Sequence, residues 1–379
     1  MKLLVIFPNF GPYHLARLRG AAAMPEFAPC IGLEIAAQEA LYPWQTAREN
    51  LGFTLETLLD GTLEEIPARE ICRKLVAYLD ESRPDVVAIC GYERAEMRAA
   101  LGWCNRQGKV AILMSESKRD DAPRKAWKEA IKRRIVRRFD AGMVGGAAHR
   151  SYLQELGLAA NRIFDGYDVV DNAAFAALAD KWRDEPKLVE RPYFLAVNRF
   201  VERKNLARVI EAWASYRANV ARNFPDQMAW DLVLCGAGEE EESLRKQAKE
   251  TGLEGVHFTG FVQQDEVARW MAGAGAFVHA ALQEQWGLVV NEAMACGLPI
   301  LLSRVCGCAP ELLEEGRNGW TFDPTRADAL SERMSYLAHE ISDERRASLG
   351  LASREIIAGW TPEKFGEGLL ECARAARGE

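Results

Sequence analysis

The sequence predicts an α/β protein of two doubly wound domains, each with a parallel sheet between layers of helices. At 379 residues the chain is too long for one ordinary domain and suits two of about 150 to 200 residues. Short apolar runs such as "KLLVIF", "DVVAIC", "YFLAVN" and "DLVLCG" alternate with longer amphipathic stretches. This rhythm is typical of buried parallel strands that are separated by helices.

The strand-like runs continue in order through both halves. "KVAILM" and "AGMVGG" extend the first series, and "GAFVHAA" and "LPILLS" extend the second. The rhythm breaks at residues 176–192, a charged segment with two prolines. We therefore expect a first domain over residues 1–175, a linker over 176–192 and a second domain over 193–360. A final helix over 361–379 should start at Thr361, before a proline, and pack back on the first domain.

Composition excludes several functional classes. A net charge of −7 argues against a general nucleic-acid-binding surface. No window approaches the roughly 20 uninterrupted apolar residues of a membrane span, and the first residues lack the features of a signal peptide. Nine scattered cysteines, with only Cys306 and Cys308 close together, do not form a zinc pattern. We expect a cytoplasmic protein with no metal site and no disulfide.

The stretch "EQWGLVVNEAMACG" carries the first candidate site. Glu284 and Glu292 enclose seven residues, and a helix should run from about residue 288 to 295. Its amino end is a ready site for a diphosphate. The free amides there are those of Gly287, Leu288 and Val289. Glu292 would then meet a ribose diol, with Glu284 on the preceding loop. Alternatively, both acids only favour the helix dipole, at about 0.3 to 1 kcal/mol each.

Two cations follow the first strand of the second domain. In "VNRFVERKN", Arg199 and Lys204 lie across a turn at the carboxyl end of that strand, where they suit a diphosphate. Alternatively, this is a solvated turn in which Glu202 pairs with Lys204. Gly236 and Gly238 directly follow another strand, either as a simple turn or where the backbone approaches a ligand.

Taken together, the motifs of the second half resemble the nucleotide-binding half of the GT-B glycosyltransferases of family 4. The resemblance covers about residues 193–360 and rests on "RFVERKN", "LVLCGAGEEEESL", the E-x7-E element, "APELLEEGRNGWTF" and the segment at Trp360. In the first half, the loop at Gly11 and "VVDNAAF", residues 169–175, resemble the glycine loop and the hinge of the family. The resemblance implies two Rossmann-like domains that face a central cleft.

The resemblance also implies an activity. It is the transfer, with retention of configuration, of a hexose from a nucleoside-diphosphate sugar, UDP-hexose favoured, to a hydroxyl of a glycan, glycolipid or small-molecule acceptor. No cofactor is implied, because the sugar nucleotide is a substrate and no metal is needed. Two alternatives remain: a UDP-sugar epimerase of the same architecture and a non-catalytic subunit that binds a nucleotide sugar.

Residue roles follow from the resemblance position by position. Arg199 and Lys204 would neutralise the departing nucleoside diphosphate, and Glu292 would take the ribose hydroxyls. Glu284 would hold hydroxyls of the donor sugar, and Phe261 in "FTGFV" would lie along the base. The remaining donor-side positions are Gly11, Gly236, Gly238, Gly287, Leu288 and Val289.

The chain departs from the family pattern at one place. Many members carry a histidine after a first-domain strand, whereas this chain has Glu116 and Ser117 there. We expect Glu116 to steady positive charge on the donor sugar, to position the acceptor hydroxyl or to cap the next helix. On the acceptor side we place Ser117 and His14, although a lone histidine on a helix face is more often structural. The remaining histidines show no supporting neighbours; they are His149, His257, His279 and His339.

Residues 124–139 hold eight basic residues and one acid, with Trp127, Ile131, Ile135 and Val136 at helical spacing. One interpretation is a solvated basic face on a helix that packs on the core. The other is a surface that meets anionic lipid or a phosphate-bearing acceptor, which places the protein peripherally at the inner face of the membrane.

Overall fold

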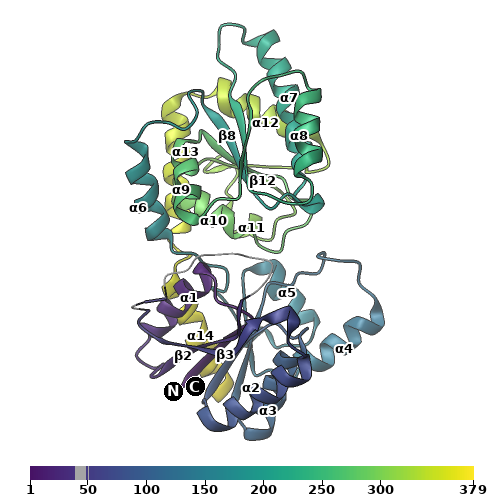
Figure 1. The fold of residues 1–379 in the computed structure, drawn as a ribbon, viewed down its shortest axis with the longest axis vertical. Coiled ribbons are helices and arrows are strands. Elements are labelled where there is room, and N and C mark those ends of the chain that lie inside the picture. The colour runs from purple at the N-terminus through teal and green to yellow at the C-terminus, as the bar shows by residue number, and fades with distance from the viewer. Residues whose placement is uncertain (39–47, 50) are drawn as a thin grey trace. The chain divides into compact units, whose positions relative to one another are not determined.

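The computed structural model describes residues 1–38, 48–49 and 51–379, and the chain divides into two compact units (Figure 1). The first unit comprises residues 1–171 and 360–379, and the second comprises residues 172–359. The second unit thus starts before residue 176, where we expected a linker. A helix, α6 (Asn172–Arg183), occupies the first part of that segment, so only the residues after it are without regular structure.

Within the described residues, the first unit contains a seven-stranded parallel sheet in the order β3-β2-β1-β4-β5-β6-β7. The strands are β1 (Leu3–Phe7), β2 (Cys30–Gln38), β3 (Thr54–Thr62), β4 (Val86–Cys90), β5 (Val110–Ser115), β6 (Ala141–Val144) and β7 (Ile163–Asp165). All five residues of β1 are fully buried, because helices cover both faces of the sheet at its centre.

Six helices cover this sheet in the part of the chain that the structure describes. They are α1 (Pro12–Ala22), α2 (Ala68–Ser82), α3 (Ala95–Gln107), α4 (Ala126–Val136), α5 (Ala147–Glu155) and α14 (Pro362–Arg377). The C-terminal helix α14 packs against α1. Two glycines allow this close approach: a Cβ at Gly20 would lie 1.7 Å from the carbonyl oxygen of Pro362, and one at Gly366 would lie 2.4 Å from that of Gly20.

The second unit contains a six-stranded parallel sheet in the order β10-β9-β8-β11-β12-β13. The strands are β8 (Tyr193–Val197), β9 (Asp231–Cys235), β10 (Val256–Gly260), β11 (Ala276–His279), β12 (Ile300–Ser303) and β13 (Gly319–Phe322). The eight strand-like runs that the sequence analysis identified correspond to β1, β4, β5, β6, β8, β9, β11 and β12.

The helices of the second unit pack in two groups (Figure 1). The first group is α7 (Leu206–Asn223), α8 (Glu241–Glu250) and α12 (Ala327–Ser335). The second group is α6, α9 (Gln264–Gly273), α10 (Leu288–Ala295) and α13 (Asp343–Ile357), and the short α11 (Ala309–Leu312) follows β12. Both units are doubly wound, so the predicted fold class is confirmed.

Candidate functional site

The helix α10 starts at Leu288, where the sequence predicted it. The backbone amides at its amino end have no partner within the helix, as at the start of any α-helix. Gly287, just before the helix, has a φ of 103°, in the left-handed region that favours glycine. A Cβ there would meet only ordinary contacts, the nearest being Glu284 Cγ at 3.4 Å. The conformation, and not the space, therefore requires glycine at this turn.

Glu284 lies in this turn at the centre of a nearly buried cluster. It forms an ion pair with Lys204, and the two side chains are 10% and 13% exposed. His279 Nε2 lies 3.0 Å from Glu284 Oε2, and the imidazole is fully buried. Burial by itself raises the pKa of Glu284, but the hydrogen bond with His279 and the charge of Lys204 outweigh it and hold the pKa well below its usual range.

Burial lowers the pKa of His279, so the neutral imidazole donates its Nε2 hydrogen to Glu284. The sequence analysis gave His279 no supporting neighbour, and that interpretation was wrong. The signal was available, because His279 ends β11 and the carboxyl ends of parallel strands share one edge of a sheet.

Lys204 reaches Glu284 because its own turn is fixed against the loop that follows β11. The backbone amide of Leu282 donates to the carbonyl of Arg203 at 2.8 Å. The side-chain amide of Asn205, a residue in the left-handed conformation with φ 60°, donates to the carbonyls of Ala280 and Pro324. The alternative in which Lys204 pairs with Glu202 is not what the structure shows.

The loop that carries Glu284 is hydrogen-bonded to the segment that contains Cys306 and Cys308. Glu284 and Cys306 form an isolated parallel bridge, and the amide of Gly307 donates to the carbonyl of Glu284 at 3.2 Å. The buried indole of Trp286 donates to Asn291 Oδ1 at 2.9 Å. The backbone that carries Glu284 is therefore hydrogen-bonded to the segment that follows β12.

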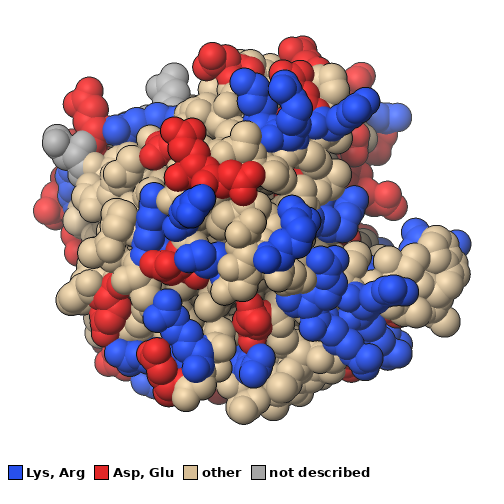
Figure 2. All heavy atoms as spheres, turned by 90° about the horizontal axis from the view of Figure 1, so that it is seen from below, with Lys and Arg blue, Asp and Glu red and all other residues tan. Residues whose placement is uncertain are grey.

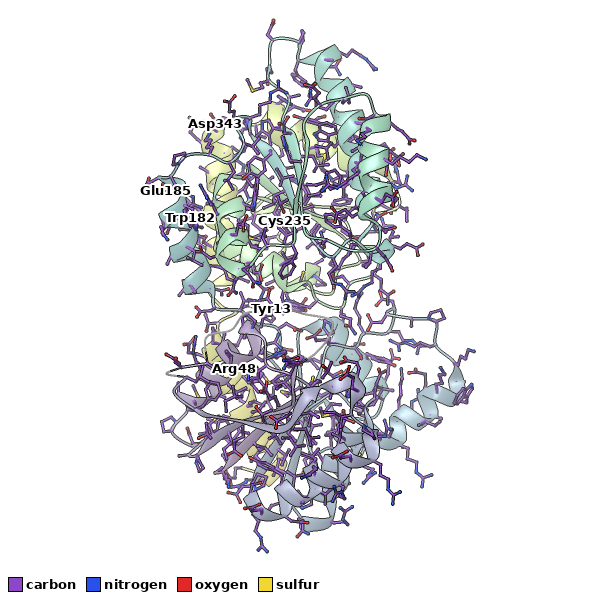
Figure 3. The ribbon with its side chains drawn as sticks, viewed as in Figure 1. Tyr13, Arg48, Trp182, Glu185, Cys235 and Asp343 are labelled. Carbon is purple, nitrogen blue, oxygen red and sulfur yellow. The ribbon has the colours of Figure 1, made fainter. Side chains whose placement is uncertain are left out.

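Glu292 is the fifth residue of α10 and is only 3% exposed. The helix dipole acts chiefly on charges in the first turn, and Glu284 is not part of the helix at all. The position of Glu292 beyond the first turn therefore does not favour a role confined to the dipole, whereas Glu284 lies on the turn just before the helix. Burial, followed by the charges of Glu266 and Glu292, raises the pKa of Cys235 to about 11. Cys235 ends β9 inside the second unit (Figure 3).

Gly236 and Gly238 follow β9 and contact the segment that carries Arg199. A Cβ at Gly236 would lie 1.8 Å from the carbonyl oxygen of Asn198, and one at Gly238 would lie 2.4 Å from that of Phe200. The amide of Phe200 also donates to the carbonyl of Ala237 at 2.9 Å. These glycines thus allow the loop after β9 to lie close to the backbone of Asn198 and Phe200, and not only to a ligand. This contact fixes the backbone on both sides of Arg199. Phe261, just after β10, is 46% exposed.

In the first unit, His14 lies at the start of α1. Its Nδ1 accepts a hydrogen bond of 3.1 Å from the amide of Gly11, and its ring centre lies 4.2 Å from that of Phe7. Burial, followed by the charge of Arg17, lowers the pKa of His14 to about 3, so the ring is neutral. These contacts give His14 a structural role in the glycine loop.

A buried carboxylate that the sequence analysis missed supports the same loop. Glu34 on β2 is fully buried and accepts hydrogen bonds from the amide of Phe10 at 3.2 Å, from Thr57 Oγ1 at 2.6 Å and from Arg48 Nη1 at 2.5 Å. Figure 3 labels Arg48 in the first unit. Nothing in the local sequence around Glu34 signals this role, because its partners come from three separate segments.

Glu116 directly follows β5 and is partly exposed. The alternative in which Glu116 caps the next helix is wrong, because α4 begins ten residues later with Lys125 at its N-cap. Ser117 lies beside it, and its amide lies 3.3 Å from Ser115 Oγ.

The helix α4 divides the apolar residues of the basic segment between two environments. Val136 is fully buried, and Ile135 packs against the core of the first unit. Trp127 and Ile131, one helical turn apart, are 61% and 52% exposed. Figure 2 shows Lys and Arg side chains gathered at the projecting side that α4 forms on the first unit. The apolar residues therefore do not form a single seam that packs on the core.

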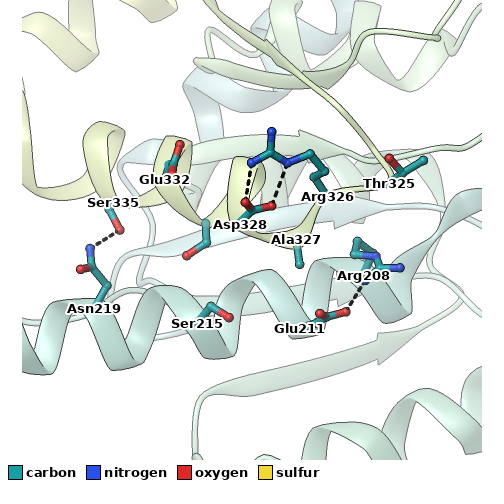
Figure 4. Close-up of a pocket in the computed structure, with 11 residues that line it drawn as sticks. Arg208, Glu211, Ser215, Asn219, Thr325, Arg326, Ala327, Asp328, Glu332 and Ser335 are labelled. Carbon is teal, nitrogen blue, oxygen red and sulfur yellow. Dashed lines mark hydrogen bonds and ion pairs between the residues drawn. The ribbon is translucent and has the colours of Figure 1, made fainter.

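A hollow of about 580 Å³ lies between α7 and α12 (Figure 4). Four of its charged side chains form two pairs: Arg326 with Asp328 at 2.5 Å and Arg208 with Glu211 at 2.7 Å. None of the residues predicted for the site lines it. Among the described residues, no group of three or more His, Cys, Asp and Glu side chains is arranged to hold a metal ion, and no helix is both long and apolar enough to cross a membrane.

Comparisons with known proteins find one family model that matches part of the chain. Residues 179–355 match the family described as "Glycosyl transferases group 1". A GDP-mannose-dependent alpha-(1-6)-phosphatidylinositol monomannoside mannosyltransferase from Mycolicibacterium smegmatis is 31% identical over 221 residues, which are 55% of each chain. The lipopolysaccharide core biosynthesis glycosyltransferase LpsE of Rhizobium meliloti is 31% identical over 177 residues, 44% of this chain and 48% of that protein. The chain thus spans about half the length of these relatives.

Solved structures match the whole chain at lower identity. The Anabaena protein HepE in complex with UDP-glucose aligns with a TM-score of 0.73 and 18% identity, over 98% of both chains. Sucrose-phosphate synthase from Thermosynechococcus elongatus aligns with a TM-score of 0.70 and 19% identity, over 95% of both chains. The chain therefore has the GT-B fold, and within its second unit residues 179–355 match the glycosyl transferases group 1 family.

Proposed function

We propose that this chain is a glycosyltransferase that moves a hexose from a nucleoside-diphosphate sugar to a hydroxyl of a glycan or lipid-linked acceptor, with retention of configuration. The observation that carries the proposal is the cluster of Glu284, Lys204 and His279 beside the free amides of α10. It combines a cation and a helix terminus for a diphosphate with a carboxylate for sugar hydroxyls.

The departing nucleoside diphosphate gains negative charge as the bond to the sugar breaks. Lys204, Arg199 and the first amides of α10 would stabilise that charge, and this is why we propose that no metal ion is required. Glu292, one helical turn further along α10, would accept the hydroxyls of a ribose. Glu284 is held ionised by its partners and would accept hydroxyls of the donor sugar.

The relatives support a sugar nucleotide as donor without fixing its base. One solved structure holds UDP-glucose, and one curated relative is named as GDP-mannose-dependent and as acting on a phosphatidylinositol mannoside. We favour UDP-hexose because the structures that align over nearly the whole chain include UDP complexes.

The experiment is incubation of the full chain with radiolabelled UDP-glucose or GDP-mannose and a lipid extract as acceptor, in the presence of EDTA. Release of nucleoside diphosphate with label in a lipid or glycan supports transfer, and the anomeric configuration of the product reports retention. Interconversion of the sugar on an intact nucleotide would instead identify an epimerase. Saturable binding without either change would identify a non-catalytic subunit, and no binding would reject the proposal.

We further propose that the chain acts in the cytoplasm at the inner face of a membrane, and that α4 contacts anionic lipid there. Trp127 and Ile131 are exposed on a helix that is rich in Lys and Arg, and this combination favours the headgroup region of an anionic bilayer. The chain should sediment with vesicles of phosphatidylglycerol more than with vesicles of phosphatidylcholine.

The variant that tests α4 is Trp127→Ser with Ile131→Ser. It should weaken sedimentation with anionic vesicles about 10-fold, because each buried apolar group contributes to partitioning. The matched control is Leu351→Ser on α13, which removes an apolar side chain that is 63% exposed on another helix. Equal sedimentation of the double variant and the control would contradict the contact.

A further inference from the structure

A second hollow in the second unit, of about 330 Å³, lies where three parallel strands of its sheet begin. Its wall includes Pro192, directly before β8, Gly275, directly before β11, and Pro299, directly before β12. The candidate donor site of Glu284 and Lys204 is instead formed by loops that follow β8 and β11, at the opposite edge of the same sheet. The hollow is therefore a separate place in the second unit.

Positive charge distinguishes this hollow from the one between α7 and α12. Among the described residues that line it, four are cations and one is an acid: Arg183, Lys187, Arg191, Arg346 and the acid Asp343. The hollow between α7 and α12 is lined by two cations and three acids. Asp343, labelled in Figure 3, is 88% exposed, so water screens much of its charge. A hollow lined mainly by one sign of charge attracts ions of the opposite sign, so this lining favours an anion.

Arg346 is held in place by the chain around it. Its Nη1 donates to three backbone carbonyl oxygens, those of Ile341 at 2.8 Å, Leu337 at 3.0 Å and Ala338 at 3.3 Å. Its Nη2 pairs with Asp343, and its guanidinium carbon lies 5.6 Å from the ring centre of Trp230, which also lines the hollow. A guanidinium carries five N–H donors, so these contacts fix its position and still leave donors for a ligand.

Arg183 is also fixed by the backbone, whereas Lys187 and Arg191 are less constrained. Arg183 Nη2 donates to the carbonyl oxygen of Cys296. Arg191 is 48% exposed, and its one ion pair among the described residues is a long contact of 3.7 Å with Asp231. Lys187 is exposed and has no ion pair within the part of the chain that the structure describes. Two cations thus line the hollow from fixed positions, and two can adjust to a ligand.

The size and charge of the hollow limit the class of ligand. A volume of about 330 Å³ is at the small end of sites that bind small molecules, which begin at about 300 Å³. Guanidinium and ammonium groups bind phosphate oxygens by charge-assisted hydrogen bonds. Four cations match the several charges of a diphosphate or triphosphate better than the single charge of a carboxylate. A small ligand with a chain of phosphate groups therefore fits both properties.

We propose that this hollow is an anion site that binds a small soluble ligand through a diphosphate or triphosphate group. Arg183 and Arg346 hold fixed positions for the phosphate oxygens, and Lys187 and Arg191 close on them from the segment before β8. Arg183 contacts the C-cap of α10, so the ligand lies near one end of the helix whose other end forms the candidate donor site. The inference does not rest on the proposed function, because none of the residues assigned to sugar transfer lines the hollow.

The test is calorimetric titration of inorganic triphosphate into the full chain and into the double variant Lys187→Ser with Arg191→Ser. These two cations are chosen because Asp231 keeps its contacts with Arg217 at 3.5 Å and with His257 at 2.9 Å when Arg191 is lost. The variant should weaken one binding event of the wild type on the order of 10-fold or more, since the phosphate loses two charge-assisted partners. Its affinity for UDP should stay within about 2-fold of the wild type.

The matched control is Arg245→Ser with Lys246→Ser. It removes the same two residue types from α8, where the side chains are 46% and 77% exposed, and it should leave triphosphate binding unchanged. Equal triphosphate affinity in the wild type and the double variant, or equal losses in the double variant and the control, would overturn the proposal. Binding of triphosphate that depends on Lys187 and Arg191, in a chain that does not bind UDP, would reject the proposed function and support this site.

Discussion

Replacement of Lys204 by methionine tests the cluster at the start of α10 most sharply. The variant keeps the apolar stem but removes the charge, so Glu284 retains His279 alone as its partner. Removing one partner of a buried ion pair typically costs about 3 to 5 kcal/mol. Both side chains keep a little exposure, 13% and 10%, and water screens part of the loss. We therefore expect Lys204→Met to lower the free energy of unfolding by about 2 to 4 kcal/mol at pH 7.

The assay is urea unfolding of the full chain followed by tryptophan fluorescence, with Lys246→Met as control. Lys246 pairs with Glu250 across an exposed helix face, with side chains 77% and 65% exposed, so its loss should change stability by less than about 0.5 kcal/mol. Adding Glu284→Gln to Lys204→Met should recover part of the loss, because it removes the unpaired buried charge.

The pH dependence of this loss has a definite sign. The pKa of Glu284 is lowered in the folded chain, so its ion pair stabilises the fold above the unfolded pKa. That stabilisation is lost as pH falls through the folded pKa. The difference in the free energy of unfolding between the wild type and Lys204→Met should therefore be largest near pH 7 and become smaller in acid. Equal losses for Lys204→Met and Lys246→Met at pH 7 would refute the reasoning.

Three further variants separate chemistry from structure. Arg199→Ala should lower turnover by about 10²-fold or more without loss of stability, because it removes a preorganised cation. Near-normal turnover in a kinetic assay would contradict the proposed role of Arg199. Gly238→Ala should lower the free energy of unfolding by about 1 to 3 kcal/mol and reduce turnover, because the added Cβ would lie 2.4 Å from the carbonyl oxygen of Phe200. The control is Gly359→Ala, whose Cβ would lie 3.8 Å from its nearest neighbour and should change neither quantity. Glu116→Ala should reduce kcat more than donor affinity, and a larger effect on affinity by calorimetry would contradict its placement against the sugar.

The fold and the turn at Gly287 followed from the sequence because both depend on local signals. Strand-like runs, the glycine before α10 and the E-x7-E spacing are readable along the chain. The partners of the predicted residues were not readable, since they come from distant segments. His279 contacts Glu284 because β11 ends at the sheet edge where the loop of Glu284 lies. Asp168 contacts Arg17, from which it is separated by 151 positions in the sequence.

The errors of the sequence analysis have physical causes of the same kind. The charged segment at 176–192 lacks strand-like runs, but α6 forms in its first part because the helix packs against α9 and α10. In the basic segment, helical spacing alone did not show which apolar residues face the core. Trp127 and Ile131 share that spacing with Ile135 and Val136, yet they lie on the exposed side of α4.

The most direct test of the account is calorimetric titration of UDP and UDP-glucose into the wild type, Glu292→Gln and Glu284→Gln, each first shown to be folded. The account assigns Glu292 to the ribose and Glu284 to the donor sugar, and a neutral amide accepts fewer hydrogen bonds than a carboxylate. Glu292→Gln should therefore bind both ligands on the order of 10-fold more weakly. Glu284→Gln should bind UDP as the wild type does and lose only the additional affinity for UDP-glucose. If neither UDP nor UDP-glucose binds the wild type, or if both variants lose UDP affinity equally, the account is contradicted.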